Sequence, residues 1–423
     1  MSLPKGWITI DYTQSFSQES TSNKKVKTKD CNDIGKFPVI DQGQEYICGY
    51  VDDQEKVIEV KTPLVIFGDH TRLIKWIDFN FVPGADGTKV LKPKSLYYPR
   101  FFYYQMRNIE LPDKGYSRHF KFLKEVDFIL PPLNEQKRIA KKLDELLATV
   151  ESIKTRLDKA PTIIKRFRQS ILAVATSGKL TEEWREENKS SAFIDTSLAD
   201  LVIKSANGLS KRSGEEGDEI IVLRLADFKN GVRTFGNERT IKLREKEQAK
   251  YVLEPNDILV VRVNGSKEIA GLFTIYKGDN EAYCDHFIRL SLDQARILPE
   301  YVKYVANEGK GRDYIINKLV SNAGQNTINQ KSLFGLSIPL PSIEEQKEIV
   351  SQVESLFALV DTLEEKIEAA KKRVDKLTQS ILAKAFKGEL VPQDPNDEPA
   401  EKLLERIKAE QEKEKPKKTR KKK

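Results

Sequence analysis

The feature that most constrains this chain of 423 residues is an internal repeat. Residues 131–180 realign without a gap on residues 341–390, at a constant offset of 210, and 17 of the 50 paired positions are identical. Glu135-Gln136-Lys137 recurs as Glu345-Gln346-Lys347. Self-similarity at a fixed offset is typical of a duplicated structural unit. We therefore expect two units, each formed by a longer region followed by one copy of the repeated segment.

Apolar residues recur in both copies with spacings that alternate between four and three. This pattern predicts a long helix with a narrow apolar seam that suits a coiled-coil partner. At about 1.5 Å per residue, the seam of each helix spans roughly 48 Å. Gly178 and Gly388 predict the helix ends, and Pro161 predicts a kink or a restart in the first helix. The seam residues expected to pair are Ile139, Leu143, Leu146, Val150, Ile153, Leu157, Ile349, Val353, Leu356, Val360, Leu363 and Ile367.

Two similar helices in one chain favour pairing with each other, and the long region between them permits an antiparallel arrangement. The alternative is that each seam packs only on its neighbouring globular region. The regions outside the repeat mix β-prone runs, such as 61–67, 219–225 and 257–263, with helical stretches such as 299–307. The expected fold class is α+β: two globular α/β domains separated by two long helices that form an antiparallel coiled coil, with a pseudo-twofold internal repeat.

The expected boundaries place a first globular domain at 1–130 and a first helical region at 131–190. A second globular domain follows at 191–340, and a second helical region at 341–407. Residues 408–423 hold nine basic and three acidic residues and no leucine, isoleucine, valine or aromatic residue, so they account for six of the eight net positive charges. Such a tail is expected to be disordered, and either adds salt-sensitive phosphate affinity or only aids solubility.

Cysteine usage and hydropathy indicate the compartment. The three cysteines (Cys31, Cys48 and Cys284) form no CxxC pair, which argues against a disulfide framework and a thiolate zinc site. No apolar run approaches the roughly 20 residues that span a bilayer, and the first residues lack the pattern of a signal peptide. The expectation is a soluble, cytoplasmic protein.

Several segments together resemble the specificity subunits of type I restriction-modification enzymes. They are GKFPVIDQGQEYICGY at 35–50, residues 65–91, AGQNTINQKSL at 323–333, the helical segments with RQSIL and TQSIL, and residues 386–407. The resemblance covers nearly the whole chain. It implies that two target-recognition domains each read one half of a bipartite site in double-stranded DNA. The helices would set the spacer and dock modification subunits, two per chain, and through these the restriction subunits.

The resemblance also implies a non-catalytic subunit without a cofactor of its own. S-adenosylmethionine, ATP and Mg²⁺ would bind to the partner subunits, which carry adenine methylation and ATP-dependent cleavage. The residues agree, because the sequence has no Asn/Asp-Pro-Pro-aromatic turn of an amino-methyltransferase and no P-loop. A loose nuclease pattern, Pro112-Asp113 with Glu135-Gln136-Lys137, is weakened by the second copy, which lacks the Pro-Asp. His70, His119 and His286 lack metal spacing, so no metal site is expected.

Candidate DNA contacts are polar and basic residues in loops after the β-prone runs, including Asp86 to Lys89. Arginine and lysine read guanine or contact phosphates, whereas asparagine and glutamine read adenine. A solvated surface loop is the competing interpretation for each, and Gln325 and Asn326 are equally typical of a structural loop. The candidates are Arg72, Lys75, Thr88, Lys89, Arg118, Arg262, Asn264, Ser266, Lys267, Gln325 and Asn326.

Because the helices match while the globular regions differ, we expect an asymmetric target with an unread gap. Insertion of heptads in either helix should lengthen that gap without changing the bases read. The alternative function is a coiled-coil scaffold protein whose globular domains bind proteins, and it predicts no sequence preference on DNA.

Overall fold

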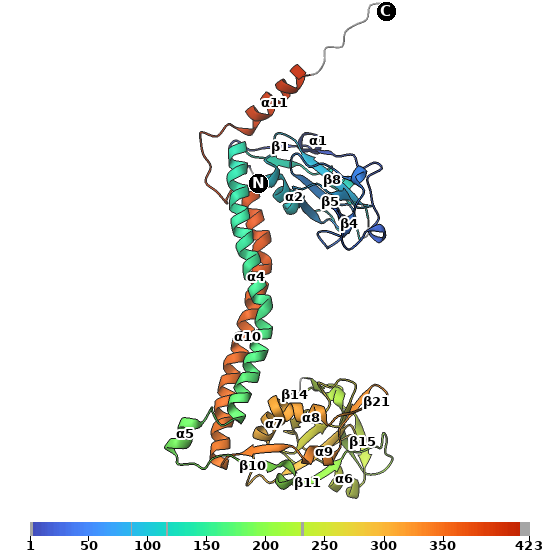
Figure 1. Cartoon of the computed structure of the whole chain (residues 1–423), viewed down its shortest axis with the longest axis vertical. Helices are drawn as coiled ribbons and strands as arrows, with labels where there is room; N and C mark the ends of the chain where they lie inside the picture. Colours follow the sequence, from blue (N-terminus) through green and yellow to red (C-terminus); the bar gives the residue numbers. More distant parts are fainter. Residues whose placement is uncertain (1–2, 86, 116, 230–231, 415–423) are drawn as a thin grey trace, which may run out of the picture. The chain divides into compact units, whose positions relative to one another are not determined.

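The computed structural model describes residues 3–85, 87–115, 117–229 and 232–414. By its internal contacts the chain divides into two units, Met1–Asp158 with Ala369–Lys423, and Lys159–Glu368. Two long helices, α4 (Leu133–Thr176) and α10 (Ile343–Phe386), contribute a segment to each unit (Figure 1). In the described part of the chain, no helix is both long enough and apolar enough to cross a membrane.

The globular part of the first unit contains two small sheets. A four-stranded antiparallel sheet has the order β2 (Phe16–Gln18), β8 (Thr88–Pro93), β5 (Leu64–Gly68), β6 (Ile74–Ile77). A three-stranded sheet has the order β4 (Gly49–Val51), β3 (Phe37–Ile40), β7 (Val82–Pro83), with β3 antiparallel to β4 and parallel to β7. The central strand β5 is buried throughout, as its continuous apolar run predicts.

Short elements link this domain to its helices. Strand β1 (Ile8–Ile10) pairs with β9 (Phe128–Leu130), directly before α4. Helix α2 (Pro99–Asn108) begins with a proline, which suits the first helical position because its missing N–H has no partner there anyway. The remaining helices of this unit are α1 (Tyr12–Ser15), α3 (Phe120–Leu123) and α11 (Ala400–Glu414).

The second unit repeats this plan. Its four-stranded antiparallel sheet has the order β11 (Val202–Asn207), β20 (Phe287–Leu292), β16 (Ile258–Val261), β18 (Phe273–Ile275). Its three-stranded sheet has the order β15 (Thr240–Leu243), β12 (Asp218–Leu223), β19 (Glu281–Tyr283), again with one antiparallel and one parallel neighbour. The two globular regions, which differ in sequence, therefore share one strand order.

The second unit also carries additional elements. A third sheet has the order β17 (Val263–Asn264), β22 (Gln325–Thr327), β21 (Val320–Asn322). Strand β10 (Ile194–Ser197) pairs with β23 (Ser337–Leu340), and β13 (Phe228–Lys229) with β14 (Val232–Arg233). Its helices are α5 (Glu182–Glu187), α6 (Glu245–Tyr251), α7 (Pro299–Asn307), α8 (Gly309–Asn317) and α9 (Gln330–Phe334). The β-prone runs and the helix expected at 299–307 are confirmed.

The repeated glutamine joins each long helix to its globular domain. Gln136 accepts a hydrogen bond from the Tyr98 backbone N–H (2.8 Å) and donates to the carbonyls of Leu96 and Pro131, both at 3.0 Å. Gln346 bonds in the same way to Leu298 (2.8 Å), Arg296 (2.9 Å) and Pro341 (3.0 Å). Both side chains are fully buried. The repeated Glu-Gln-Lys thus fixes the start of α2 and α7 against α4 and α10.

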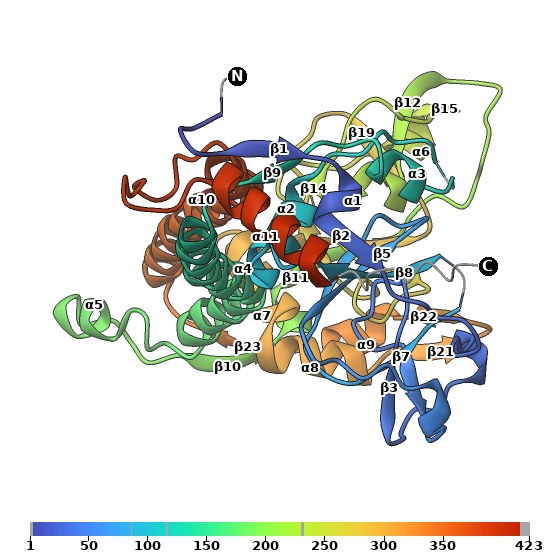
Figure 2. The ribbon, with the colours of Figure 1, turned by 90° about the horizontal axis from the view of Figure 1, so that it is seen from above.

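In each unit the segments of α4 and α10 lie side by side and antiparallel, and Figure 2 shows the two helices nearly end-on. In the first unit Lys154 pairs with Asp375 (3.0 Å) and Lys371 with Asp158 (3.8 Å). In the second unit Arg168 pairs with Asp361 and with Glu364 (3.2 Å) in the same register. The predicted antiparallel coiled coil is therefore confirmed.

The seam is fully buried near the start of each long helix and partly exposed further along it. Ile139, Leu143, Ile349 and Val353 are fully buried. Val150 and Val360 are buried as well, and Leu146, Leu157, Leu356 and Ile367 are half-buried. Ile153 and Leu363 are 38% and 41% exposed, because a pair of helices without a third neighbour covers only one side of each seam residue.

Two expectations for the helical regions need correction. Of the two outcomes expected at Pro161, a kink or a restart, the restart is wrong, because α4 continues through this residue; the buried Ile164 and Ile171 hold the following turns in place. Helix α11 extends to Glu414, so residues 408–414 of the expected disordered tail are helical. The stretch from 400 to 414 is rich in strong helix formers, namely alanine, lysine, glutamate and glutamine. Residues 415–423 of that tail lie outside the described residues.

Candidate nucleic-acid interface

The loop of residues 69–73, which follows β5, is held firmly in the first unit. The Asp69 carboxylate accepts a hydrogen bond from the Phe120 backbone N–H (2.8 Å) and lies 3.5 Å from the Lys89 Nζ. Gln42 accepts from the His70 N–H (3.0 Å), and its carbonyl accepts from the Thr71 hydroxyl (2.7 Å). The loop can therefore present side chains in a fixed geometry.

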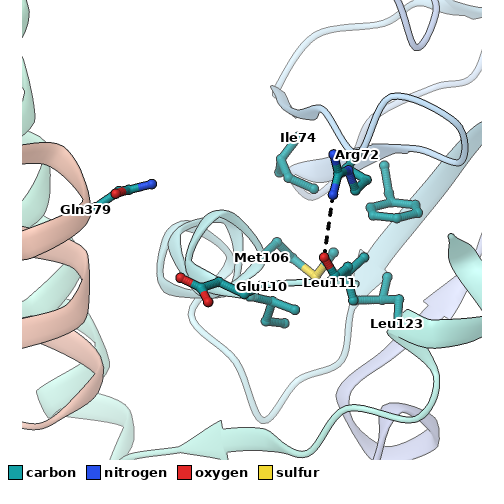
Figure 3. Close-up of a pocket in the computed structure, with 9 residues that line it drawn as sticks. Arg72, Ile74, Met106, Glu110, Leu111, Leu123 and Gln379 are labelled. Atoms are coloured by element: carbon teal, nitrogen blue, oxygen red, sulfur yellow. Dashed lines mark hydrogen bonds between the residues drawn. The ribbon is translucent and has the colours of Figure 1, made fainter. Parts of the chain in front are cut away.

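Arg72 is the exposed basic residue of this loop. Its guanidinium donates to the Leu111 carbonyl (3.5 Å), as Figure 3 shows. It also donates to the Asp113 carboxylate (3.2 Å). These bonds close one side of a cavity of about 390 Å³ whose wall includes Met106 and Leu123. The Gly115 N–H and the Arg72 guanidinium lower the pKa of the Asp113 carboxyl. Arg72 thus ties the segment 111–113 to the loop 69–73 and stays solvent-accessible for a phosphate or a base.

Two candidates of the first unit are buried instead. Lys75 is 6% exposed, and its Nζ donates to the Glu45 carbonyl (2.6 Å) and lies 3.6 Å from Asp41. Burial lowers the pKa of Lys75. Thr88 is 1% exposed in β8. The prediction that they contact DNA is wrong for both, because strand alternation turns each side chain into the domain.

The other first-unit candidates keep access to solvent. Lys89 is partly exposed and lies over the Phe120 ring as well as beside Asp69. Arg118 is exposed next to the buried His119, whose backbone N–H donates to the Asp69 carbonyl (2.8 Å). Asp86, from the polar loop considered above, lies outside the described residues. Arg72, Lys89 and Arg118 remain the candidates of this unit.

The candidates of the second unit converge on one feature, which we call the double loop: residues 264–270 together with 321–326. Strands β17 and β22 pair Asn264 with Asn326. The Asn326 amide donates to the Gly265 carbonyl (2.8 Å), and its Oδ1 accepts from the Ser321 hydroxyl (2.6 Å). Asn326 is only 5% exposed and holds the double loop together, so of the two interpretations of this residue the structural one holds.

The exposed tip of the double loop carries polar side chains. Lys267 and Gln325 are exposed, whereas Asn264 and Ser266 are half-buried. The Asn264 Oδ1 accepts from the Ser266 N–H (2.9 Å), which fixes the turn. Ala323 and Gly324 both have positive φ (47° and 77°), so the second turn also has a defined, tight shape. Lys267 and Gln325 therefore remain the exposed candidates of the double loop.

Arg312, on α8, is hydrogen-bonded to the backbone of the double loop. Sequence reasoning missed this residue. Its Nη2 donates to the carbonyls of Lys267 (2.7 Å), Glu268 (3.0 Å) and Ala270 (2.9 Å). Burial lowers the pKa of Arg312, although Glu308 and Glu268 partly offset this. A lone arginine in the amphipathic pattern of a helix gives no sign that its partners are carbonyls more than 40 residues away.

Arg262 lies between the double loop and a polar cluster. Its Nη1 donates a hydrogen bond to the Asp285 carbonyl (2.9 Å). The Asp285 carboxylate accepts hydrogen bonds from both Nη atoms of Arg212, at 2.9 and 3.3 Å. Cys284, Asp285 and His286 place one ligand atom each within 4.8 Å of one another. Because Arg212 already neutralises the carboxylate, this arrangement suits an ion pair better than a metal ion.

Basic residues at equivalent places in the two units were also missed. Lys25, Lys27 and Lys29 are exposed in the connection from β2 to β3. Lys211 and Arg212 lie in the equivalent connection from β11 to β12. The run KKVKTK at 24–29 is visible in the sequence and could have identified the first of these segments. Exposed lysines in such loops supply phosphate contacts that carry no sequence information.

Comparisons with known proteins agree on one family. A family model described as "Type I restriction modification DNA specificity domain" matches residues 3–162 and 195–372. The chain is 53% identical over 295 residues to the type I restriction enzyme StySPI specificity subunit of Salmonella potsdam, an alignment that covers 67% of this chain and 64% of that protein. It is 33% identical over 370 residues to the type I restriction enzyme EcoDI specificity subunit of Escherichia coli, with 76% and 79% covered.

The chain spans less than two-thirds of the length of the Salmonella relative. Among solved structures, the HsdS subunit from Thermoanaerobacter tengcongensis superposes with a TM-score of 0.56 at 18% identity, over 92% of this chain and 98% of that one. This likeness shows that the fold is shared.

Proposed function

The chain belongs to the type I restriction-modification DNA specificity family, and from this membership we propose that it is the DNA specificity subunit of such a system. Residues 1–130 and 191–340 are the two target-recognition domains, and residues 131–190 and 341–407 are the helical regions between them. Each recognition domain reads one half of a bipartite site in double-stranded DNA. The chain has no catalytic residues of its own and directs adenine methylation and restriction by partner subunits.

One observation carries this proposal. The two globular regions share the same strand order and the same glutamine anchor on their helices, yet their exposed loops differ. The loop 69–73 in the first unit carries an arginine, whereas the double loop in the second unit carries lysine, serine and glutamine. Two domains of the same fold with different exposed loops suit a DNA target made of two different half-sites. Two identical domains would instead be expected to bind a palindromic target.

The partners follow from the same membership. Modification subunits, two per chain, dock on this subunit and bring S-adenosylmethionine, while restriction subunits bring ATP and Mg²⁺. All of them act on DNA in the cytoplasm. The chain thus supplies sequence recognition and geometry, and the partners supply the chemistry.

The test is methylome sequencing of cells that produce the modification subunit with and without this chain. The expected result is one asymmetric, gapped motif that appears only when the chain is present. Replacing Lys267 and Gln325 together by alanine should alter or abolish recognition of one half of the motif and leave the other half unchanged. Methylation that is independent of the chain, or a purified complex without sequence preference on DNA, would contradict the proposal and favour a protein-binding scaffold.

A further inference from the structure

Each unit has a hollow in the angle between its four-stranded sheet and its long helix. In the first unit the hollow measures about 710 Å³ and is lined by Trp76 in β6, Asp78 just after it, Arg100 on α2 and Asp144 on α4. In the second unit it measures about 650 Å³ and reaches from β18 and α7 to Glu354 on α10. Both hollows lie away from the loop 69–73 and the double loop described above.

Strand pairing shows that the two hollows are built from equivalent positions. Val65 pairs with Leu91 on one side and with Trp76 on the other. Ile258 pairs with Leu290 and with Ile275 in the same sheet order. Val65 and Ile258 also lie in the core clusters that contain the equivalent seam residues Ile139 and Ile349, so we align the two strands on them. This alignment makes Trp76 and Ile275 counterparts, and both are half-buried and line their hollow.

The helical walls correspond in the same way. The glutamine anchors make Tyr98 and Leu298 counterparts, so Arg100 of α2 corresponds to Glu300 of α7. Asp144 and Glu354 are separated by the offset of the repeat. Asp78 and Lys277 follow the counterpart strand residues by two positions. Four positions therefore line both hollows.

The charges at these positions show what the two hollows share. Asp78 and Arg100 in the first unit become Lys277 and Glu300 in the second, where the pair lies 3.9 Å apart. The signs are exchanged together, so each pair stays neutral. The carboxylate of the long helix, Asp144 or Glu354, is retained. The common features are thus an apolar residue on the strand and an acidic group on the helix.

In the first unit part of the hollow is already organised around the carboxylate. Arg100 lies 4.9 Å from the centre of the Trp76 ring and donates to Asp144 at 2.8 Å, and Tyr104 also donates to Asp144. A carboxylate has about four lone-pair sites, so one further donor can still approach. Glu354 is exposed in the second unit, where the exposed Phe235 and Val232 add apolar surface.

We infer that the two hollows are equivalent docking sites for the same element of two modification subunits, one on each unit. The inference rests on the proposed function. A partner that binds twice in the same way must meet the same chemistry twice, and the retained chemistry is an apolar contact beside a carboxylate. The docking element therefore presents an apolar side chain next to a lysine or arginine. A retained carboxylate disfavours a DNA phosphate as the occupant.

The test uses matched substitutions at the counterpart positions Asp78 and Lys277, both of which are exposed. Asp78→Trp and Lys277→Trp fill the hollows, whereas Asp78→Ala and Lys277→Ala leave them open. The full chain is produced with the modification subunit of its own system, and native mass spectrometry gives the number of subunits bound. Far-ultraviolet circular dichroism and the melting temperature monitor the fold of each variant.

Two modification subunits should bind to the unsubstituted chain and to both alanine variants. Each tryptophan variant should retain one subunit, with the affinity of the blocked site lowered about tenfold or more, and the double tryptophan variant should retain none. Retention of two subunits by either tryptophan variant would overturn the inference, as would binding of a single subunit by the unsubstituted chain. If no modification subunit binds to any of the chains, both the inference and the proposed function are wrong.

Discussion

Arg312 illustrates how a buried residue can govern a loop that it does not belong to. Its Nη2 donates to three carbonyls of the double loop, and Asn326 fixes the other side of the same loop. A buried guanidinium with several carbonyl acceptors is costly to remove, because each acceptor is left without its partner. Arg312 therefore acts as a positioning residue for Lys267 and Gln325.

We predict that Arg312→Met lowers the free energy of unfolding by about 3 kcal/mol and also weakens discrimination in one half of the target. The matched control is Arg289→Met. Arg289 is a buried arginine of the same unit that bonds to Asp257 and to the Val252 carbonyl, not to the double loop. It should lose similar stability but methylate the same motif. Sequencing of methylated sites measures the difference, and an unchanged motif in Arg312→Met would contradict the assigned role.

Glu135 and Glu345 occupy the same position of the repeat but have different partners. Glu135 accepts from the Trp7 indole N–H (2.9 Å), and burial raises its pKa. Glu345 accepts from the Thr181 hydroxyl (2.6 Å) and from the Arg185 Nε (3.0 Å) and Nη2 (2.8 Å). The second carboxylate is therefore part of a buried ion pair, whereas the first is a buried acceptor for a neutral donor.

Glu345→Gln should lower the free energy of unfolding by about 3 kcal/mol, because it leaves Arg185 without its charge partner. Glu135→Gln should change it by less than about 0.5 kcal/mol at pH 7. Because the folded-state pKa of Glu135 is raised, the native protein loses stability as the pH rises above the unfolded-state value of this group. Relative to the native chain, Glu135→Gln should therefore gain stability from pH 4 to pH 7 in urea unfolding. Equal effects of the two substitutions would contradict this account.

At the scale of the elements, the register of α4 against α10 links their length to the gap in the target. Asp158 and Lys371 face each other at 3.8 Å, so insertions after both residues keep the seam paired. One heptad in each helix adds about 10.5 Å, which corresponds to about three base pairs at 3.4 Å each.

We predict that this double insertion lengthens the unread gap by about three base pairs and leaves both half-sites unchanged, as methylome sequencing would show. The matched control is a two-residue insertion at the same two places, which turns the following seam residues by about 200° away from the partner helix and should lower the melting temperature. A changed half-site with an unchanged gap would contradict the prediction.

At the scale of the whole molecule, the charge is concentrated in one segment. Residues 415–423 carry seven basic and no acidic residues, so the remaining 414 residues have a net charge near zero. Truncation after Glu414 should weaken DNA binding at low salt and reduce the slope of log affinity against log salt by up to about six. The methylated motif should stay the same. Binding measured at several salt concentrations tests this, and an unchanged slope would show that the tail serves only solubility.

The duplicated plan of the molecule can be predicted from the order of its residues alone. A repeated segment whose apolar residues are spaced alternately by four and three predicts a pair of helices. This prediction is possible because the apolar face of a helix depends only on the spacing of residues along the sequence. The continuous apolar runs predicted the central strands β5, β12 and β16 for the same reason. The basic run at 24–29 is an equally local signal.

Which polar residues face solvent depends on contacts that form only in the folded chain. Lys75, Thr88 and Asn326 looked like Lys89 and Gln325 in the sequence, and yet the first three are buried. Whether a polar side chain points outward depends on strand register and on partners far along the chain, such as Glu45 for Lys75 and Gly265 for Asn326. The common architecture of the two globular regions was hidden for the same reason. Many different sequences can adopt the same strand order, provided that each buried hydrogen-bond donor and acceptor has a partner in the folded protein.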